Sequence, residues 1–175
     1  MTKGSMTIKK VLSEDLETLR ALAERTFRDA WQDDNTPENF ETYCSRKFSA
    51  ERFREEYEQP GSEFYLGTVD EKPVAYIKLN LHTSPAEFPD ISPAIQLERI
   101  YVLQGFQAHQ FGARLLEFSE DRAVKTGAQW LWLGVWQKAP RAIGFYEKNG
   151  FEIFGVETFW LGDDPQTDWL MKKKC

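Results

Sequence analysis

The stretch "LERIYVLQGFQAHQFGARLL" (Leu97–Leu116) predicts a β-strand that runs into an α-helix through a short polar loop. The chain carries 28 acidic and 22 basic residues and a net charge of −6, yet no Asp or Glu stands between Gln104 and Leu116. Chance is one explanation, because a segment this short lacks carboxylates by accident fairly often. The alternative is that the loop binds an anion.

A strand–loop–helix turn suits an anion because the first helical N–H groups are unpaired and lie at the positive end of the helix dipole. Gly112 would let the backbone approach a phosphate closely, since glycine has no Cβ. The alternative is that this glycine serves packing alone. The chain contains neither the GxxxxGK[ST] pattern of a Walker loop nor the GxGxxG dinucleotide fingerprint, so other features must decide.

Composition limits the class of protein. A hydrophobic content of 41% and an aromatic content of 14% over 175 residues predict one domain with a substantial core. The acidic excess argues against an extended nucleic-acid surface and fits a cationic partner better.

Cys44 and Cys175 are isolated, so neither a zinc or other metal site nor a disulfide framework is indicated. The N-terminus lacks the apolar stretch of a signal peptide, and no segment approaches the ~20 apolar residues of a membrane span, so we expect a soluble cytoplasmic protein.

The first third of the chain predicts one strand and three helices. "TIKKVL" (residues 7–12) is short and partly alternating, which favours a strand. Ser13 is expected to cap a helix whose apolar residues recur at helical spacing. After a break, Thr36–Pro37 restarts a helix, because proline suits the first helical position. Ser49 begins a third short helix, and Gln59–Ser62 ends the helical part.

The rest of the chain alternates strands with helices. "EFYLGTV" and "VAYIKLNL", on either side of "DEKP", predict a hairpin. The later elements are, in order, a strand ending at residue 102, a helix over about residues 111–126, a strand over 129–135, a helix around 140–150, and strands over 151–161 and 167–173 joined by "GDDPQ". This order implies locally parallel strands crossed by helices. We predict a single-domain α/β (α+β) fold, with a mixed sheet of about seven strands flanked by helices.

A second segment, "RAIGFYEKNGF" (Arg141–Phe151), stands a strand and a helix after the loop. The loop resembles the Q-x-x-G-x-G/A pyrophosphate loop of the GCN5-related N-acetyltransferase (GNAT) superfamily, and "AIGFYEKNGF" is similar to its A-x-x-F-Y-x-x-x-G-F segment. The resemblance covers nearly the whole chain. It is closest to bacterial PaiA-like polyamine acetyltransferases, through "NTPENFETY", "LERIYVL", "LWLGVW" and "LGDDPQTDWLM". It implies the GNAT fold and an N-acetyltransferase.

The resemblance implies acetyl-CoA as co-substrate. It assigns the pantetheine arm to backbone groups of Ile100, Tyr101 and Val102 at the end of a strand. The pyrophosphate is assigned to the following turn, at Gln107, His109, Gln110, Phe111, Gly112, Ala113 and Arg114.

Three positions on the cofactor surface that the resemblance implies need separate comment: two depart from the family pattern, and one has two possible roles. Gln110 stands where the family has its first glycine, and it is tolerable there only if its backbone avoids positive φ. Arg141 replaces an asparagine that is common in the family, so a pantetheine contact is missing or is replaced by a cation near the cofactor. Arg114 either meets phosphate or belongs to a solvated helix face.

Acetyl transfer needs a neutral amine and then a proton for the departing thiolate. The coenzyme thiol should have a pKa near ~8.5 by analogy with cysteine, so a phenol with a pKa of about 10 can serve as donor. Tyr146 stands at the family's tyrosine position, which implies the general acid. The alternative is an aromatic residue of an amphipathic helix, next to Phe145.

The proton acceptor is sought on the strand before the loop. Period-two alternation predicts that residues 96, 98, 100 and 102 share one face. Some GNAT enzymes use a glutamate where this chain has Gln96, which cannot be a base. Glu98 faces the same way in this scheme and is the candidate base, acting through water. The alternative is an ion-paired strand carboxylate, with Arg99 or Arg20 as partner.

Two acidic segments are expected, on the family's fold, to line the acceptor side. "DDNTPENFETY" offers Asp33, Asp34, Glu38 and Glu41 with Tyr43, and "LGDDPQTD" offers Asp163, Asp164 and Asp168. Their plain alternatives are a helix break or cap and a β-turn.

We expect a polycation such as spermidine or spermine as the acceptor. An N-acetyltransferase for a protein or peptide N-terminus, an amino acid or an antibiotic amine remains open. So does a protein that senses acyl-CoA without turnover, and so does a homodimer.

Overall fold

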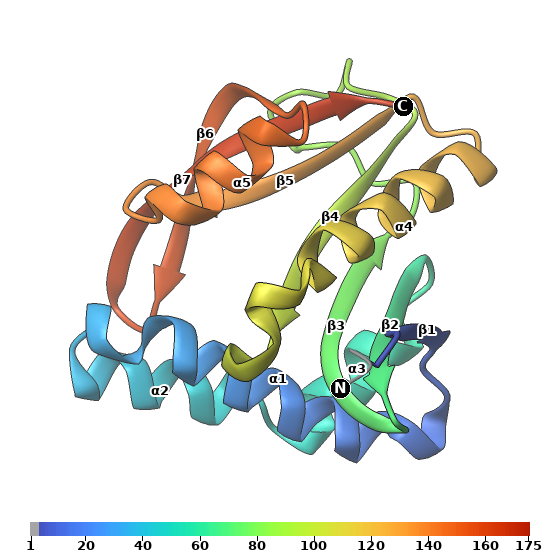
Figure 1. Ribbon diagram of the computed structural model, residues 1–175. Coiled ribbons are helices and arrows are strands. Elements are labelled where there is room, and N and C mark those ends of the chain that lie inside the picture. Colours follow the sequence, from blue (N-terminus) through green and yellow to red (C-terminus); the bar gives the residue numbers. More distant parts are fainter. Residues whose placement is uncertain (1–3) are drawn as a thin grey trace.

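Seven strands form one sheet in the computed structural model, which describes residues 4–175 (Figure 1). The strand order is β1-β2-β3-β4-β5-β7-β6, and every neighbouring pair is antiparallel except β4 and β5. The strands are β1 (Thr7–Lys10), β2 (Ser62–Val69), β3 (Lys72–Asn80), β4 (Ala94–Val102), β5 (Trp130–Trp136), β6 (Glu152–Leu161) and β7 (Asp164–Lys174). The predicted mixed sheet of seven strands is confirmed.

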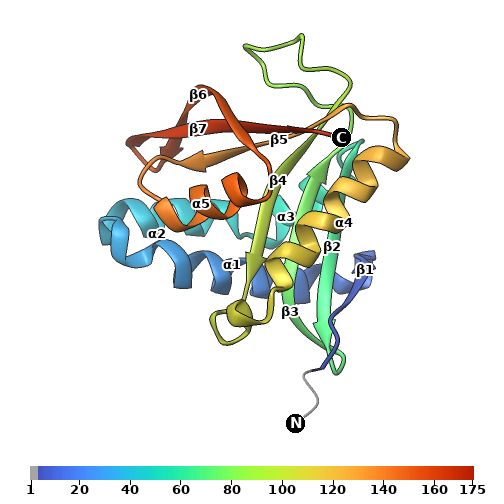
Figure 2. The ribbon, with the colours of Figure 1, turned by 45° about the horizontal axis from the view of Figure 1, so that its top comes forward.

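Helices cover both faces of the sheet (Figure 2). The helices are α1 (Leu16–Trp31), α2 (Pro37–Lys47), α3 (Ala50–Glu58), α4 (Phe111–Lys125) and α5 (Pro140–Lys148), with short 3₁₀ turns at Ser13–Asp15, Gln32–Asp34 and Gln104–His109. α1, α2 and α3 lie on one face, and α4 and α5 lie on the other. None of the helices described is long and apolar enough to cross a membrane.

The two faces bury separate apolar clusters, because the side chains of a strand alternate between its faces. Tyr76 and Leu66 of the sheet pack against α1, α2 and α3. Ile77 and Leu97 belong to the cluster under α4 and α5. Tyr146 of α5 also belongs to this second cluster.

Two predicted boundaries are wrong. Ser13 is not a helix cap: the chain enters a 3₁₀ turn at this residue, and Asp15 instead accepts a hydrogen bond from the Leu12 N–H at 3.0 Å. The loop "GDDPQ" is shorter than predicted, because Asp164, Pro165 and Gln166 belong to β7. Gly162, with φ of +60°, makes the tight turn that permits this.

A β-bulge interrupts β4. Lys78 of β3 pairs with Arg99 and the next residue, Leu79, pairs with Leu97, so Glu98 is an extra residue without a partner. The bulge reverses the alternation beyond it. Ile100 packs with the cluster under α4, whereas Arg99 packs over Phe53 of α3 on the opposite face. The prediction that residues 96, 98, 100 and 102 share one face is therefore wrong.

β4 and β5 separate soon after they meet (Figure 1). Only Ala94–Gln96 of β4 pair with Trp130–Trp132 of β5. Both strands continue beyond this paired segment. β5 is held along its whole length by β7, which inserts between β5 and β6. The later part of β4 thus has backbone groups on its β5 side without a strand partner, and a passage opens between the two faces of the sheet.

Candidate active site

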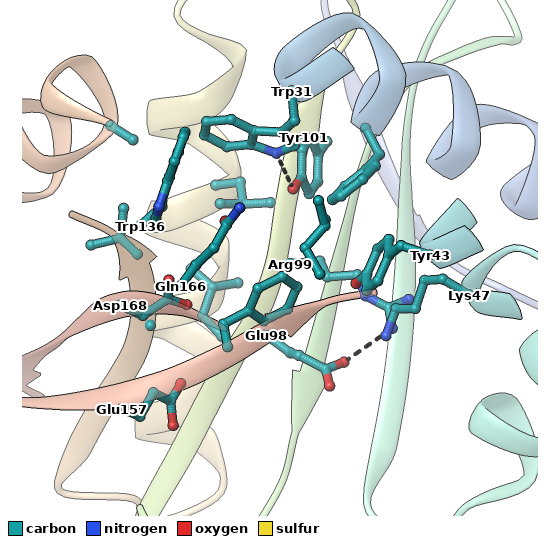
Figure 3. Close-up of a pocket in the computed structure, with 18 of the residues that line it drawn as sticks. Trp31, Tyr43, Lys47, Glu98, Arg99, Tyr101, Trp136, Glu157, Gln166 and Asp168 are labelled. Atoms are coloured by element: carbon teal, nitrogen blue, oxygen red, sulfur yellow. Dashed lines mark hydrogen bonds and ion pairs between the residues drawn. The ribbon is translucent and has the colours of Figure 1, made fainter. Parts of the chain in front are cut away.

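A pocket of about 340 Å³ lies at the separation of β4 and β5 (Figure 3). Residues from α1, α2, β3, β4, β5, α5, β6 and β7 line it, so it draws on both faces of the sheet. Aromatic side chains make up much of its wall: Phe27, Trp31, Tyr43, Phe48, Tyr76, Tyr101, Trp136, Tyr146 and Phe159. This volume and apolar lining suit a small organic molecule.

Tyr146 reaches the pocket from α5 and is 9% exposed. Burial, with a smaller contribution from Tyr101, raises the pKa of its hydroxyl above the ordinary value. Tyr146 therefore keeps its proton at neutral pH. Tyr146 is an aromatic side chain of the core, as the alternative expected, and it also borders the pocket, so its role as general acid stays a prediction.

Two carboxylates form one end of the pocket. Glu157 of β6 and Asp168 of β7 are directly opposed partners in the antiparallel pair, so their side chains lie on the same face. Gly134 of β5 leaves room for them, since a Cβ there would stand 2.7 Å from Glu157 Oε1 and 3.4 Å from Asp168 Oδ2. Burial, together with Glu157, raises the pKa of Asp168 to about 7. Asp168 can thus take or release a proton near neutral pH.

The opposite end of the pocket is cationic (Figure 3). Arg99 and Lys47 line it, and both contact Glu56, a buried carboxylate of α3, at 2.8 Å and 3.4 Å. Burial lowers the pKa of Lys47 to about 8, with Arg99 as the next cause. Asp168 and Glu157 lie across the pocket from these cations in Figure 3.

Glu98 lines the pocket but is engaged in ion pairs. Its carboxylate lies 2.5 Å from Lys78 Nζ and 3.6 Å from Arg99 Nη2. Burial alone would raise the pKa of Glu98, but Arg99 and Lys78 outweigh it and hold the pKa below the ordinary value. Of the two expected partners, Arg99 is present, whereas Arg20 pairs with Glu17 and Glu24 instead. A carboxylate held in this way is a weak proton acceptor.

Polar groups between the two ends are already oriented. The Trp31 indole N–H donates to the Tyr101 hydroxyl at 3.0 Å (dashed line in Figure 3). Gln166 donates to Asn35 at 2.8 Å and to Asp164 at 2.9 Å, and it lines the pocket with Asn35. These contacts leave the Tyr101 hydroxyl free to donate toward the pocket.

The predicted anion-binding turn lies on the α4 side of the sheet. Gln110 occupies the N-cap position of α4 with φ of +59°, so the condition that its backbone avoids positive φ is not met. A glycine normally takes this conformation, because other residues suffer a clash there. Gln107 donates its side-chain N–H to the Val102 carbonyl at 3.3 Å, which ties the turn to the end of β4.

Packing does not require the glycine in this turn. A Cβ on Gly112 would approach only Phe145, at 3.6 Å, an ordinary contact distance. A hollow beside the turn is lined by Gln110, Ala113 and Arg114, together with Glu117 and Glu120 of α4, Asn149 just after α5, and Lys173 of β7. Arg114 therefore borders a concave surface, and Arg141 is exposed in the first turn of α5.

Most of the acidic residues expected at the acceptor do not line the pocket. Asp33, Asp34, Glu38 and Asp163 are exposed on the surface. Glu41 is bound to Arg28, with oxygens at 2.6 Å and 3.1 Å from the guanidinium nitrogens. Asp164 acts indirectly through Gln166, and of the eight residues expected at the acceptor only Tyr43 and Asp168 border the pocket.

Sequence reasoning missed Glu157, Gly134 and Lys47. "VETFW" carries no signal beyond an alternating strand, so Glu157 becomes notable only when β7 pairs beside it. Gly134 in the apolar run "LWLGVW" was a detectable signal, because a glycine inside a strand often marks a close approach. Within residues 4–175 no group of three or more His, Cys, Asp or Glu side chains could hold a metal ion.

Comparisons with known proteins agree with this architecture. Residues 16–151 match the model of the acetyltransferase (GNAT) family. An uncharacterized N-acetyltransferase of Lactobacillus delbrueckii subsp. lactis is 35% identical over 95% of both chains. The spermidine N(1)-acetyltransferase of Thermoplasma acidophilum is 26% identical over 97% of this chain and 98% of its own.

Solved structures are similar over the whole chain. The crystal structure of PaiA N-acetyltransferase from Thermoplasma acidophilum, in complex with coenzyme A, superposes with a TM-score of 0.77 at 24% identity, over 98% of this chain and 99% of its own. A GCN5-related N-acetyltransferase from Rhodopseudomonas palustris gives a TM-score of 0.76 at 18% identity, over 100% and 99% of the two chains. At these identities the likeness concerns the fold.

Proposed function

The chain belongs to the acetyltransferase (GNAT) family and is an acetyl-CoA-dependent N-acetyltransferase, and we propose that its acceptor is a primary amine of a small molecule bound in the pocket. The observation that carries this proposal is the passage between β4 and β5, which brings Tyr146 from one face of the sheet and Asp168 from the other to a single pocket.

The residues of this chain fit acetyl-CoA on the α4 side. Residues 100–102 of β4 have no strand partner on the β5 side, so backbone groups there suit the amide-rich pantetheine arm, and of these the Val102 carbonyl already accepts from Gln107. The turn at residues 107–114 offers helix N–H groups, no carboxylate and a glycine that packing does not demand. Arg114, beside the hollow, suits a phosphate. When bound, the cofactor supplies the acetyl group as a thioester.

We assign proton transfer to two residues of the pocket. Tyr146 is the proposed general acid, because burial keeps its hydroxyl protonated until negative charge develops beside it. Asp168 is the proposed proton acceptor, since its pKa of about 7 leaves it ionised in part at neutral pH. Glu98 has the lower pKa and is held by Lys78, so we assign it to the pocket wall rather than to the base.

Spermidine and spermine are the first acceptors to test. The name of the Thermoplasma relative and the acidic residues Asp33, Asp34 and Asp163 at the surface support a polycation. One ammonium group suits the Glu157–Asp168 end of the pocket. The remaining ammonium groups would have to stay near the acidic surface, because Lys47 and Arg99 repel them from the opposite end.

Release of free coenzyme A thiol, measured over a panel of amines, tests the proposed function. Gly112→Glu should abolish binding of acetyl-CoA in calorimetry, because it adds bulk and a negative charge to the turn. Val124→Glu is the matched control, since Val124 is 63% exposed near the far end of the same helix. Unchanged acetyl-CoA affinity in a folded Gly112→Glu protein would remove the cofactor from this turn.

A further inference from the structure

The cationic end of the pocket has more positive than negative charge. Lys47, Lys78 and Arg99 surround only two carboxylates, Glu56 and Glu98. All five side chains are more than two-thirds buried, so water compensates this excess poorly. Arg52, which also contacts Glu56, is half-exposed and has Glu55 as a second partner.

Arg99 has unused hydrogen-bonding capacity at this end. Its side chain is 7% exposed, and its Nη2 bonds both oxygens of Glu56, at 2.8 Å and 3.0 Å. Its Nη1 is buried without a hydrogen-bond partner among residues 4–175. A buried guanidinium N–H that lacks a partner carries a desolvation cost, which an anionic ligand group in the pocket would remove.

The acidic end has the opposite imbalance. Glu157 and Asp168 are opposed partners of β6 and β7, so two carboxylates lie side by side. Burial is the largest cause that raises both pKa values, and the next cause is a neighbouring carboxylate, Glu87 for Glu157 and Glu157 for Asp168. Tyr101, Arg99 and Asp168 all line this one pocket. The pocket is therefore dipolar, with an uncompensated negative end and an uncompensated positive end.

We infer that the acceptor carries a carboxylate as well as its primary amine, with the amine at the Glu157–Asp168 end and the carboxylate at the Lys47–Arg99 end. The inference rests on the proposed function and narrows its acceptor to amino-carboxylates, such as amino acids. A polyamine meets only one of the two ends, and its further ammonium groups are repelled by the other. An amino-carboxylate neutralises both.

Matched acceptor pairs test this inference. 4-Aminobutyrate, 6-aminohexanoate, lysine and phenylalanine are compared with propylamine, pentylamine, cadaverine and phenethylamine, which lack the carboxylate. We expect kcat/KM to favour at least one carboxylated member by about tenfold or more, the discrimination expected of a charge-assisted hydrogen bond. The distance between amine and carboxylate in the best acceptor also indicates how far apart the two charged ends of the pocket lie.

Lys47→Gln tests the contact between the acceptor carboxylate and the protein, because it removes the charge of Lys47 and keeps a side chain of similar size. It should raise the KM of the preferred amino-carboxylate by roughly tenfold and so reduce the ratio of its kcat/KM to that of the matched amine. Lys47→Arg should retain this ratio. Lys72→Gln, at an exposed position of β3, is the control and should leave the kcat/KM ratio unchanged. Arg99 is not the first choice for substitution, because it also holds Glu56.

Calorimetry provides a readout without turnover. Binding of 6-aminohexanoate and lysine to the protein is compared with binding of pentylamine and cadaverine, in wild type and in Lys47→Gln. Tighter binding of a carboxylated member that Lys47→Gln weakens supports the inference. Equal or tighter binding of the amines, or spermidine as the best acceptor, overturns it while leaving an N-acetyltransferase in place. Absence of thiol release with every amine would instead count against the proposed function, and the binding comparison would still decide the inference.

Discussion

Tyr146 illustrates how one side chain can serve both packing and chemistry. Its ring stands edge-on to Phe151, with the ring centroids 5.8 Å apart, inside the cluster under α4 and α5. Its hydroxyl end borders the pocket because β4 has moved away from β5 at that point. Removal of the hydroxyl alone should therefore disturb the reaction more than the fold.

Tyr146→Phe should lower kcat by about 10²-fold, the effect typical of a removed general acid, with acetyl-CoA affinity within a few-fold of wild type. Steady-state kinetics and calorimetry measure the two quantities. Tyr57→Phe, on a different helix, serves as control. Wild-type turnover in Tyr146→Phe would mean that water or another group protonates the thiolate.

Asp168 makes the stability of the protein depend on pH. Its pKa is about 7 in the folded protein and near ~3.9 in an unfolded chain. As pH rises, the unfolded state therefore loses its proton first, and the protein loses stability between about pH 4 and pH 7. Above about pH 7 the contribution of Asp168 to the free energy of unfolding no longer changes with pH.

Asp168→Asn removes that loss, so the Tm gain of the variant over wild type should grow from pH 4 to pH 7 and then level off. Thermal unfolding followed by circular dichroism measures it, with Asp163→Asn in the exposed turn as control. The same variant should lose turnover, since the proposed proton acceptor is gone. A Tm difference that does not change with pH would show that the carboxyl of Asp168 titrates normally.

At the scale of the element, the turn before α4 is strained where its function is expected. Gln110 holds φ of +59°, and non-glycine residues in this region are destabilised by about 1 kcal/mol. The turn nevertheless begins α4, whose first turn contains no carboxylate. Strain at such a position is commonly retained at binding sites.

Gln110→Gly should raise the free energy of unfolding by roughly 0.5 kcal/mol, because relief of strain exceeds the added freedom of the unfolded chain. Urea denaturation measures the change. Ala108→Gly, in the same turn but without positive φ, should have the opposite sign. Destabilisation by both substitutions would show that Gln110 is not strained.

At the scale of the whole molecule, one buried carboxylate joins a helix to the sheet. Glu56 of α3 is 2% exposed and contacts Lys78 of β3 and Arg99 of β4 at 3.1 Å and 2.8 Å. Although burial opposes it, Arg99 and the two neighbouring lysines hold the pKa of Glu56 at about 2. This cluster also forms the back of the cationic end of the pocket.

Glu56→Gln should lower the free energy of unfolding by about 3 kcal/mol or more, because it leaves buried cations without their counter-charge. Glu55→Gln, whose side chain is 58% exposed, should change it by less than about 1 kcal/mol. Chemical denaturation at pH 7 compares the two. Equal effects would mean that solvent screens the cluster around Glu56 as well as it screens the surface.

The sequence by itself determined the elements and their class. Apolar residues at helical or alternating spacing depend only on near neighbours, which is why β4 and α4 were predicted close to their observed bounds. The loop at residues 104–110 and the segment around Tyr146 were recognisable for the same reason: each is a local pattern that requires no knowledge of distant residues.

Only the tertiary structure decided what the pocket contains. The bulge at Glu98 redirected β4 and made the predicted shared face of residues 96–102 wrong, and a bulge depends on the partner strand β3. Asp168 meets Glu157 through the pairing of β6 with β7, and Lys47 meets Arg99 through the packing of α2 and α3 against the sheet. Charges so far apart in sequence interact only once folding has brought them together and removed the water that screens them.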